Sequence, residues 1–187
     1  RVLGVIRPTV EVVPQRTHTK HIGVLATPGT VASESYVIEL LKQDPTLIVT
    51  QQACPMWVPL IESGEHLSDG ANYFVEKYLT ELLTRDPLID TIILGCTHYP
   101  LLQPKIEAFL SSIAHSQSTV TNHHISVVSQ GSIVADSFAD YLHRHPEFSQ
   151  DSKGGTCKYL TTESAAKFSE SASIFLSEPI TAHHIEL

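Results

Sequence analysis

The residues whose side chains are best suited to catalysis follow one another in one short segment. An apolar run ends at Gly95, and Cys96, Thr97 and His98 then present a thiol, a hydroxyl and an imidazole. A free thiol has a pKa of about 8.5, so it needs a partner to act as a thiolate near neutral pH. His98 can be that partner, or it can transfer a proton to a substrate itself. The segment therefore predicts a nucleophile or an acid/base pair at the end of a buried strand.

The alternative for an isolated cysteine is a small residue of the core, which is about as frequent. The neighbours of Cys96 favour a functional loop, because Gly95 permits close approach of the backbone and Pro100 fixes the exit of the chain. Cys54 and Cys157 lack such neighbours, and we expect core packing or an exposed thiol for them. Three cysteines without a C-x-x-C pattern indicate free thiols in a reducing compartment.

Short apolar runs alternate with helical patterns along the chain. We expect strands at 1–6, 21–26, 47–52, 91–94, 125–128, 158–162 and 182–187, and helices at 31–42, 69–84, 101–113, 131–143 and 163–176. This alternation predicts an α/β fold with parallel sheets, in which ligands bind at the carboxyl ends of the strands. Thr27, Cys54 and Cys96 each follow a strand end, so we expect all three at one crevice.

Composition and charge narrow the possible functions. Apolar residues make up 42% of the 187 residues and charged residues 17%, which is typical of a folded domain. The net charge of −8 argues against a broad basic face for nucleic acid or anionic membrane. No apolar run approaches the roughly 18 residues of a membrane span. We expect surface positions rather than a metal site for the remaining histidine groups, which are His123–His124, His143, His145 and His183–His184.

Residues 92–102 strongly resemble the second catalytic-cysteine motif of the glutamate racemases. Further segments resemble that family in the same order along the chain, so the resemblance covers essentially all of it. These segments are Gly-Val-Ile-x-Pro at 4–8, the Ile-Gly-Val segment at 22–31, Ala-Cys-Pro with Val-Pro-Leu-x-Glu at 53–62, and Tyr-x-Thr at 159–161.

The resemblance implies a bacterial cytoplasmic enzyme that interconverts L- and D-glutamate for peptidoglycan synthesis without a cofactor. Its fold would be two α/β lobes of the aspartate/glutamate racemase type, with one catalytic cysteine from each lobe. The implied catalytic residues are Cys96, His98 and Glu62, where Glu62 would hydrogen-bond and orient His98; the implied substrate contacts are Thr97, Thr27 and Thr30. Simpler interpretations exist for two of these groups: a lone glutamate is usually solvated, and Thr27 can cap a helix.

The sequence also departs from the family. The family's first catalytic cysteine lies in an Ala-Cys-Asn-Thr-Ala motif, preceded by Asp-Ser-Gly and Pro-Tyr-Gly segments, and none of these occurs here. We therefore expect residues 1–115 to form a complete second lobe and residues 116–187 to form the C-terminal portion of a first lobe whose N-terminal portion is absent. Racemisation needs an acid/base group on each face of the α-carbon, so we expect the chain to be truncated and inactive alone.

Two alternatives remain open. One is a related aspartate or hydantoin racemase, although such families usually lack His-Tyr-Pro after the second cysteine. The other is a non-catalytic fragment that retains the fold and binds carboxylates. An incomplete first lobe would leave an exposed sheet edge, and such edges invite pairing with another chain. We therefore expect a homodimer or self-association, with glutamate as the small-molecule partner.

Overall fold

The computed structural model describes residues 4–115, 124–148 and 156–186. It divides into two compact units, Arg1–Asp140 and Tyr141–Leu187, and helix α7 (Gln130–Arg144) runs across the division. This division differs from the boundary expected from the sequence, between 115 and 116, because the strand that follows residue 116 pairs with the sheet of the first unit.

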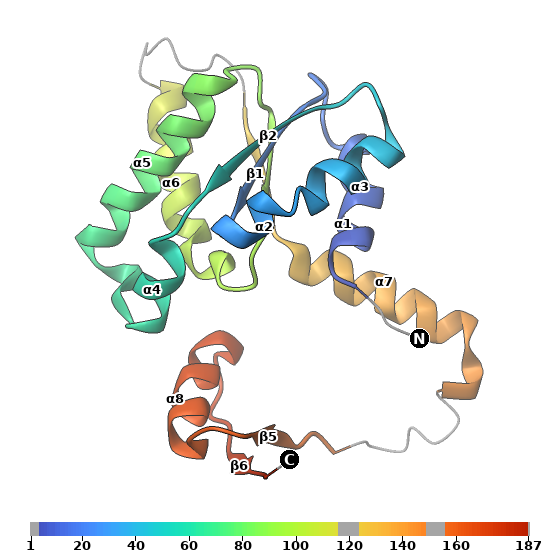
Figure 1. Cartoon of the computed structure of the whole chain (residues 1–187), viewed down its shortest axis with the longest axis vertical. Helices are drawn as coiled ribbons and strands as arrows, with labels where there is room; N and C mark the ends of the chain where they lie inside the picture. The colour runs from blue at the N-terminus through green and yellow to red at the C-terminus, as the bar shows by residue number, and fades with distance from the viewer. Residues whose placement is uncertain (1–3, 116–123, 149–155, 187) are drawn as a thin grey trace. The chain divides into compact units, whose positions relative to one another are not determined.

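The first unit is built on a parallel four-stranded sheet with the order β2-β1-β3-β4 (Figure 1). Its strands are β1 (His21–Ala26), β2 (Ile48–Ala53), β3 (Thr91–Leu94) and β4 (Ser126–Val128). Its helices are α1 (Ile6–Val12), α2 (Pro28–Ala32), α3 (Ser35–Gln43), α4 (Trp57–Glu62), α5 (Asp69–Arg85), α6 (Gln103–His115) and most of α7, with 3-10 turns η1 (Val13–Gln15), η2 (Glu65–Leu67) and η3 (Tyr99–Leu102). The α/β fold with a parallel sheet expected from the sequence is confirmed.

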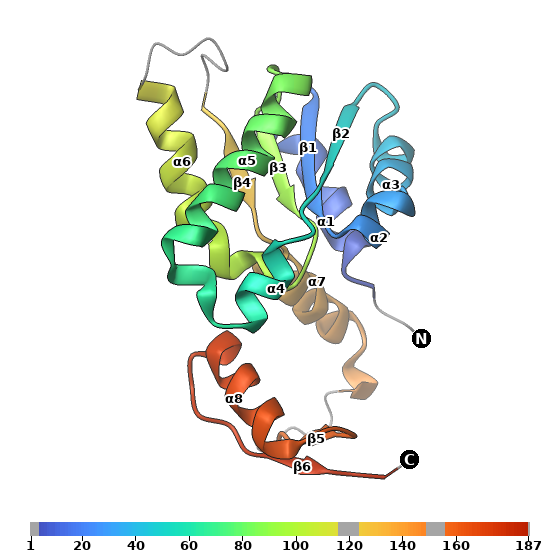
Figure 2. The same cartoon turned by 60° about the vertical axis from the view of Figure 1, so that its left-hand side comes forward.

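Helices cover both faces of this sheet. Helices α5 and α6 lie on one face and α1 and α3 on the other (Figure 2). The side chains of the central strands alternate between the two layers, as the pleat of a strand requires. Val24 and Ile93 belong to the core cluster on the α1 and α3 side, whereas Leu25, Ile92 and Leu94 belong to the cluster on the α5 and α6 side. Both faces are buried, which explains the continuous apolar runs of β1 and β3.

The strand expected at 1–6 is wrong for the residues that the structure describes. Ile6 begins helix α1, and residues 1–3 lie outside the described part of the chain. A short apolar run cannot separate a strand from a buried helix by itself. Here the helical spacing of Ile6, Val10 and Val13 favours a helix over a strand. Val10 and Val13 are fully buried on one side of it. Pro8 is tolerated because it lies in the first turn, where its missing N–H leaves no intrahelical bond unmade.

The second unit contains a smaller parallel sheet. Strand β5 (Tyr159–Thr161) pairs with β6 (Ala182–His184), and helix α8 (Ala165–Leu176) connects them. The serines of α8 hold the returning segment, since Ser169 Oγ accepts a hydrogen bond from the backbone N–H of Ala182 at 2.9 Å. A turn η4 (Pro146–Phe148) precedes this sheet in the chain. Two strands of three residues form a marginal sheet, so this unit has little of its own to stabilise it.

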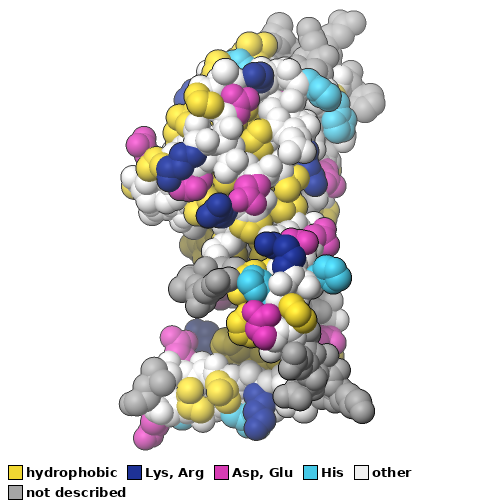
Figure 3. Space-filling model, turned by 90° about the vertical axis from the view of Figure 1, so that its right-hand side faces the viewer, with side chains coloured by type: hydrophobic (Ala, Val, Ile, Leu, Met, Phe, Trp, Pro, Cys, Tyr) yellow, Lys and Arg dark blue, Asp and Glu magenta, His cyan; other side chains and the backbone are white. Residues whose placement is uncertain are grey.

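Surface charges of both signs are mixed on the face that includes α1 and α3 (Figure 3). Arg7 pairs with Glu11 at 2.9 Å and Lys42 with Glu39 at 2.6 Å. Among the side chains coloured in that view, no extended basic patch is visible. Within the described residues, no helix is both long enough and apolar enough to cross a membrane.

Asp90 fastens the segment before β1 to the start of β3, at the edge opposite Cys96. Its carboxylate accepts hydrogen bonds from Thr17 Oγ1 at 2.6 Å, the N–H of His18 at 2.7 Å, the N–H of Thr19 at 2.8 Å and Thr91 Oγ1 at 3.0 Å. Burial alone would raise the pKa of Asp90, but these bonds outweigh it and lower the pKa from 3.8 to about 2. The carboxylate therefore stabilises the folded state in its charged form.

We expect this site to dominate the acid sensitivity of the first unit. Because the pKa of Asp90 is lower in the folded state, its contribution of about 2 kcal/mol is complete above roughly pH 4 and is lost as the pH falls towards 2. Urea unfolding of Asp90→Asn between pH 2 and 7 should show a flatter profile than the wild type. The same substitution at the exposed Asp136 is the control and should leave the profile unchanged. Equal slopes for wild type and Asp90→Asn would contradict the assignment.

Candidate active site

The candidate site lies at the carboxyl edge of the first sheet. Strands β1, β2 and β3 are neighbours and run in parallel, so the residues that follow them, Thr27, Cys54 and Cys96, leave the sheet at the same edge. The three residues therefore lie at one edge of the sheet, but of the three only Cys96 lines the cavity described below. Cys54 does not face a crevice, however, because its side chain is 1% exposed within the core.

The backbone of Cys96 is fixed by its neighbour Gly95. The N–H of Gly95 donates to the carbonyl of Leu25 at 2.8 Å, which continues the ladder between β3 and β1. A Cβ atom at this position would lie 3.1 Å from the Leu25 oxygen, 3.1 Å from Tyr36 Cε2 and 3.2 Å from Ala26 Cβ. The absence of a side chain thus lets residues 95–98, here called the Cys96 loop, sit directly on β1 and α3.

We expect Gly95→Ala to destabilise the first unit by about 1–3 kcal/mol, because the added methyl group overpacks a site bounded by backbone and a buried ring. Urea unfolding measures the change. Gly29→Ala is the matched control, since a Cβ there meets nothing within 4 Å and alanine favours the helix. Equal stability of the two variants would show that the close approach at Gly95 is not needed.

Cys96, His98 and Glu62 form a line of polar contacts. Cys96 Sγ lies 3.8 Å from His98 Nδ1, and His98 Nε2 lies 2.5 Å from Glu62 Oε1. The hydrogen bond expected between Glu62 and His98 is therefore present. Because the Nε2–H of His98 donates a hydrogen bond to Glu62, the other ring nitrogen, Nδ1, is the one that faces the thiol. His98 is 24% exposed and Glu62 47%, so solvent reaches this end of the line.

The packing beneath the line sets its geometry. Trp57 begins helix α4, at whose other end Glu62 lies, and its ring meets the ring of Tyr99 edge-on at 4.7 Å. Tyr99 directly follows His98, is fully buried, and donates from its hydroxyl to the carbonyl of Cys54 at 3.2 Å. Burial raises the pKa of Tyr99, which keeps this hydroxyl a donor. The core therefore holds both ends of the hydrogen bond between Glu62 and His98.

Of the three threonines expected at the site, the structure brings one together with Cys96. Thr97 and Cys96 both line a cavity of about 280 Å³ at the end of β3. Thr27 and Thr30 do not line it. Thr27 caps α2, since its Oγ1 accepts from the N–H of Thr30 at 3.3 Å and lies 3.0 Å from Thr30 Oγ1. The capping role weighed from the sequence is confirmed, while a role in substrate binding stays a prediction.

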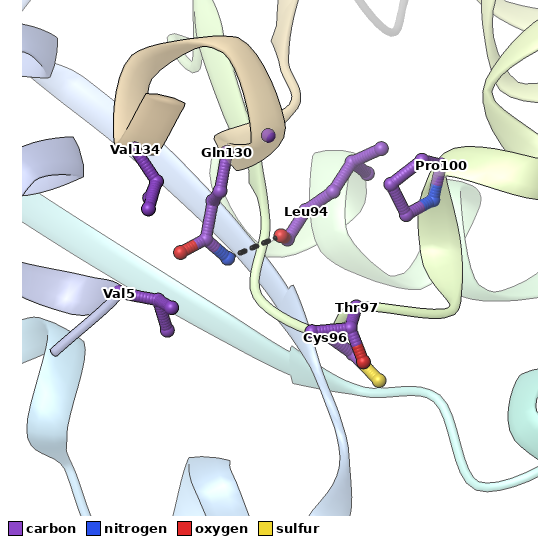
Figure 4. A pocket seen from close by; sticks show the side chains of 8 residues that line it. Val5, Leu94, Cys96, Thr97, Pro100, Gln130 and Val134 are labelled. Carbon is purple, nitrogen blue, oxygen red and sulfur yellow. Dashed lines mark hydrogen bonds between the residues drawn. The ribbon is translucent and has the colours of Figure 1, made fainter. Parts of the chain in front are cut away.

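The cavity is mostly apolar, and one of its lining residues, Gln130, was not predicted from the sequence as part of the site. Its other lining residues are Val5, Leu94, Pro100, Gln130, Gly131 and Val134. Figure 4 shows Gln130 beside Leu94, to whose carbonyl its Nε2 donates at 2.7 Å. Gln130 lies just past the end of β4, so its position after a strand was the signal available in the sequence.

The remaining cysteines and the histidine groups give no second reactive centre in the described residues. Cys54 is buried, and that burial raises the pKa of its thiol. Cys157 is exposed in the second unit. Over the described ranges, no three His, Cys, Asp or Glu side chains are placed to hold a metal ion. His123 lies outside the described residues.

No protein-family model matches the sequence. The chain is 36% identical over 190 residues to the glutamate racemase of Lactiplantibacillus plantarum, covering 100% of this chain and 64% of that protein. It is also 36% identical over 187 residues to the glutamate racemase of Enterococcus faecalis, again covering 100% of this chain and 64% of the relative. The chain thus spans just under two thirds of the length of these relatives.

Solved structures agree with these sequence comparisons. A crystal structure of a glutamate racemase isoform from Bacillus anthracis superposes with a TM-score of 0.83 at 29% identity, over 100% of this chain and 65% of that one. The glutamate racemase of Aquifex pyrophilus gives a TM-score of 0.66 at 30% identity, over 98% of this chain and 63% of that one. Over its whole length, this chain is homologous to the glutamate racemases.

Proposed function

We propose that this chain carries one acid/base half of a glutamate racemase, an isomerase that interconverts L- and D-glutamate without a cofactor. The observation that carries the proposal is the contact line from Cys96 through His98 to Glu62, in a chain homologous to glutamate racemases. The product would supply D-glutamate for peptidoglycan synthesis, and the enzyme would work in the bacterial cytoplasm.

The chemistry requires two groups on opposite faces of the α-carbon. One group removes the α-proton, and the other delivers a proton to the opposite face, which inverts the centre. The Cys96 thiolate would take the proton from L-glutamate; in the reverse direction, the Cys96 thiol would protonate the intermediate formed from D-glutamate. His98 would accept or return a proton at Nδ1, beside the sulfur, and Glu62 would hold the ring in that orientation.

Hydroxyl groups near the thiol would bind the substrate. Thr97 is exposed next to Cys96 and can donate a hydrogen bond to a glutamate carboxylate. Thr27 and Thr30 leave the neighbouring strand at the same edge, and their paired hydroxyls would provide further contacts. In this scheme Thr27 would both cap α2 and contribute to substrate binding, because ligands bind at this edge of parallel sheets.

The second acid/base group would come from outside these 187 residues. Cys54 is buried with a raised thiol pKa, and the sequence around Cys157 contains no motif like the one around Cys96. In the proposed arrangement, the unit that carries Cys96 is the second lobe of the racemase and residues that follow belong to the first. We therefore expect these residues to be inactive alone.

Self-association is the expected behaviour of the second unit. Several of its large apolar side chains are exposed within that unit, namely Leu160, Phe168, Ile174, Phe175 and Leu176. A two-stranded sheet with such side chains can add strands or pair with another copy. A homodimer or larger species in sedimentation experiments would agree with this expectation.

A graft tests the function. The 187 residues replace the matching segment of the Lactiplantibacillus plantarum relative, and chiral chromatography follows L- and D-glutamate and L- and D-aspartate. We expect the folded graft to racemise glutamate and not aspartate. Turnover of aspartate alone would favour the related aspartate racemases, and a folded graft inert to both would favour a carboxylate-binding fragment. Circular dichroism and thermal unfolding establish that the graft is folded.

A further inference from the structure

The peptide group that joins Leu94 to Gly95 directly precedes Cys96, and it is held at both ends. The Gly95 N–H donates to the Leu25 carbonyl of β1 at 2.8 Å. The Leu94 carbonyl accepts from Gln130 Nε2 at 2.7 Å, the bond drawn in Figure 4. Because a trans peptide is planar, its N–H and C=O point in opposite directions. The two bonds therefore fix the plane of this peptide from β1 on one side and from α7 on the other.

A side chain makes the second bond because the strand on that side has ended. The last pair in register between β3 and β4 is Ile93 with Val128. Two residues after Val128, the chain has entered helix α7 at Gln130, so no strand backbone continues beside Leu94. The amide of Gln130 thus supplies the donor that a longer β4 would have supplied. Without it, this carbonyl would lose the partner that buried backbone groups need.

The amide of Gln130 is itself held. Only its Nε2 can donate to a carbonyl, so Oε1 points the other way, where it lies 3.3 Å from Thr9 Oγ1. Thr9 is fully buried in α1, and its hydroxyl proton serves either Gln130 or the Val5 carbonyl at 3.1 Å. Tyr36 lies beneath Gly95; burial raises its pKa to about 12, and a hydrogen bond with Gln130 partly opposes the rise.

We propose that Gln130 is a positioning residue for Cys96, which fixes the peptide before the thiol and thereby the place of the sulfur beside His98. The proposal rests on the proposed role of Cys96 for its significance, but the claim about the Cys96 loop can be tested without racemisation. A glutamine does this because it is long enough to reach back from the first turn of α7 and carries a donor and an acceptor at once.

Two variants distinguish the loss of the hydrogen-bond donor at Gln130 from the addition of a negative charge there. Gln130→Glu keeps the shape and places a carboxylate oxygen against the Leu94 carbonyl, while Gln130→Met keeps the length and removes the donor. Gln15→Glu is the matched control, since Gln15 is exposed in the same unit. Two measurements on the whole chain report on the conformation of the Cys96 loop. They are amide hydrogen exchange at 95–97, and the pH profile of Cys96 alkylation by iodoacetamide, resolved from Cys54 and Cys157 by peptide mass spectrometry.

We expect exchange at 95–97 to accelerate about tenfold in both variants, as the loss of one buried hydrogen bond implies. The Cys96 alkylation profile should change in both, with β1 amides and the Gln15→Glu control unaffected. Exchange and alkylation within twofold of the wild type would overturn the proposal. Equal acceleration throughout the sheet would also overturn it, because Gln130 would then support only the fold. An inactive graft together with the expected loop effects would reject the proposed function and leave the Gln130 result standing.

Discussion

Replacing Cys96 by serine in the graft is expected to lower racemisation by about 10³-fold, within the range that a positioned acid/base group contributes. The serine hydroxyl occupies nearly the same place but ionises far less readily than a thiol, so it cannot remove the α-proton at neutral pH. Initial rates with L- and D-glutamate measure the loss. Cys157→Ser is the control, because Cys157 is an exposed thiol in the other unit, and it should keep full activity.

The same variant also identifies the face on which Cys96 acts. If Cys96 serves L-glutamate, Cys96→Ser should suppress exchange of the L α-proton with solvent more than exchange of the D α-proton, because the opposite group still acts on D-glutamate. Equal loss of both exchanges would leave the thiol essential but its face unassigned. Activity within threefold of the unsubstituted graft would remove Cys96 from the mechanism.

His98→Asn is expected to lower the rate of the graft by about 10²-fold, and Glu62→Gln by about tenfold. Asparagine places an amide near the position of Nδ1 but cannot exchange a proton with the thiol. Glutamine keeps the contact with His98 but no longer accepts with a charged oxygen. Glu65→Gln, the same change at an exposed position of η2, is the control and should be neutral.

A double variant tests whether the two residues act as one unit. If Glu62 works only through His98, then His98→Asn with Glu62→Gln should be no slower than His98→Asn alone. Additive losses would mean that Glu62 has a separate role. A Glu62→Gln variant as active as the Glu65→Gln control would show that the hydrogen bond at 2.5 Å does not serve the reaction.

Much of the fold followed from the sequence, because the central strands of this sheet are buried on both faces. Continuous apolar runs and helical spacing predicted β1, β3 and α5 to within one residue at each end. The expected strand at 1–6 failed because a five-residue apolar run suits either a strand or a helix. Only the packing of Val10 and Val13 against the sheet distinguishes them.

The candidate site was predictable where its residues are close in sequence or share a motif. Cys96, Thr97 and His98 are adjacent, and Glu62 was found through resemblance alone, since nothing local distinguishes it from a solvated carboxylate. Gln130 was missed because its function depends on where β4 stops relative to β3. The register of two strands far apart in the chain decides this, and no local pattern reports it.

The measurement that tests the central claim most directly is proton NMR of L- and D-glutamate in D₂O, which follows the α-proton and the enantiomer together. It is made with the 187-residue chain and with the graft. We expect no exchange with the chain alone, and exchange with inversion of both enantiomers with the graft. Inversion by the chain alone would mean that these residues contain both acid/base groups, and a folded graft without exchange would mean that the Cys96 site is not half of a glutamate racemase.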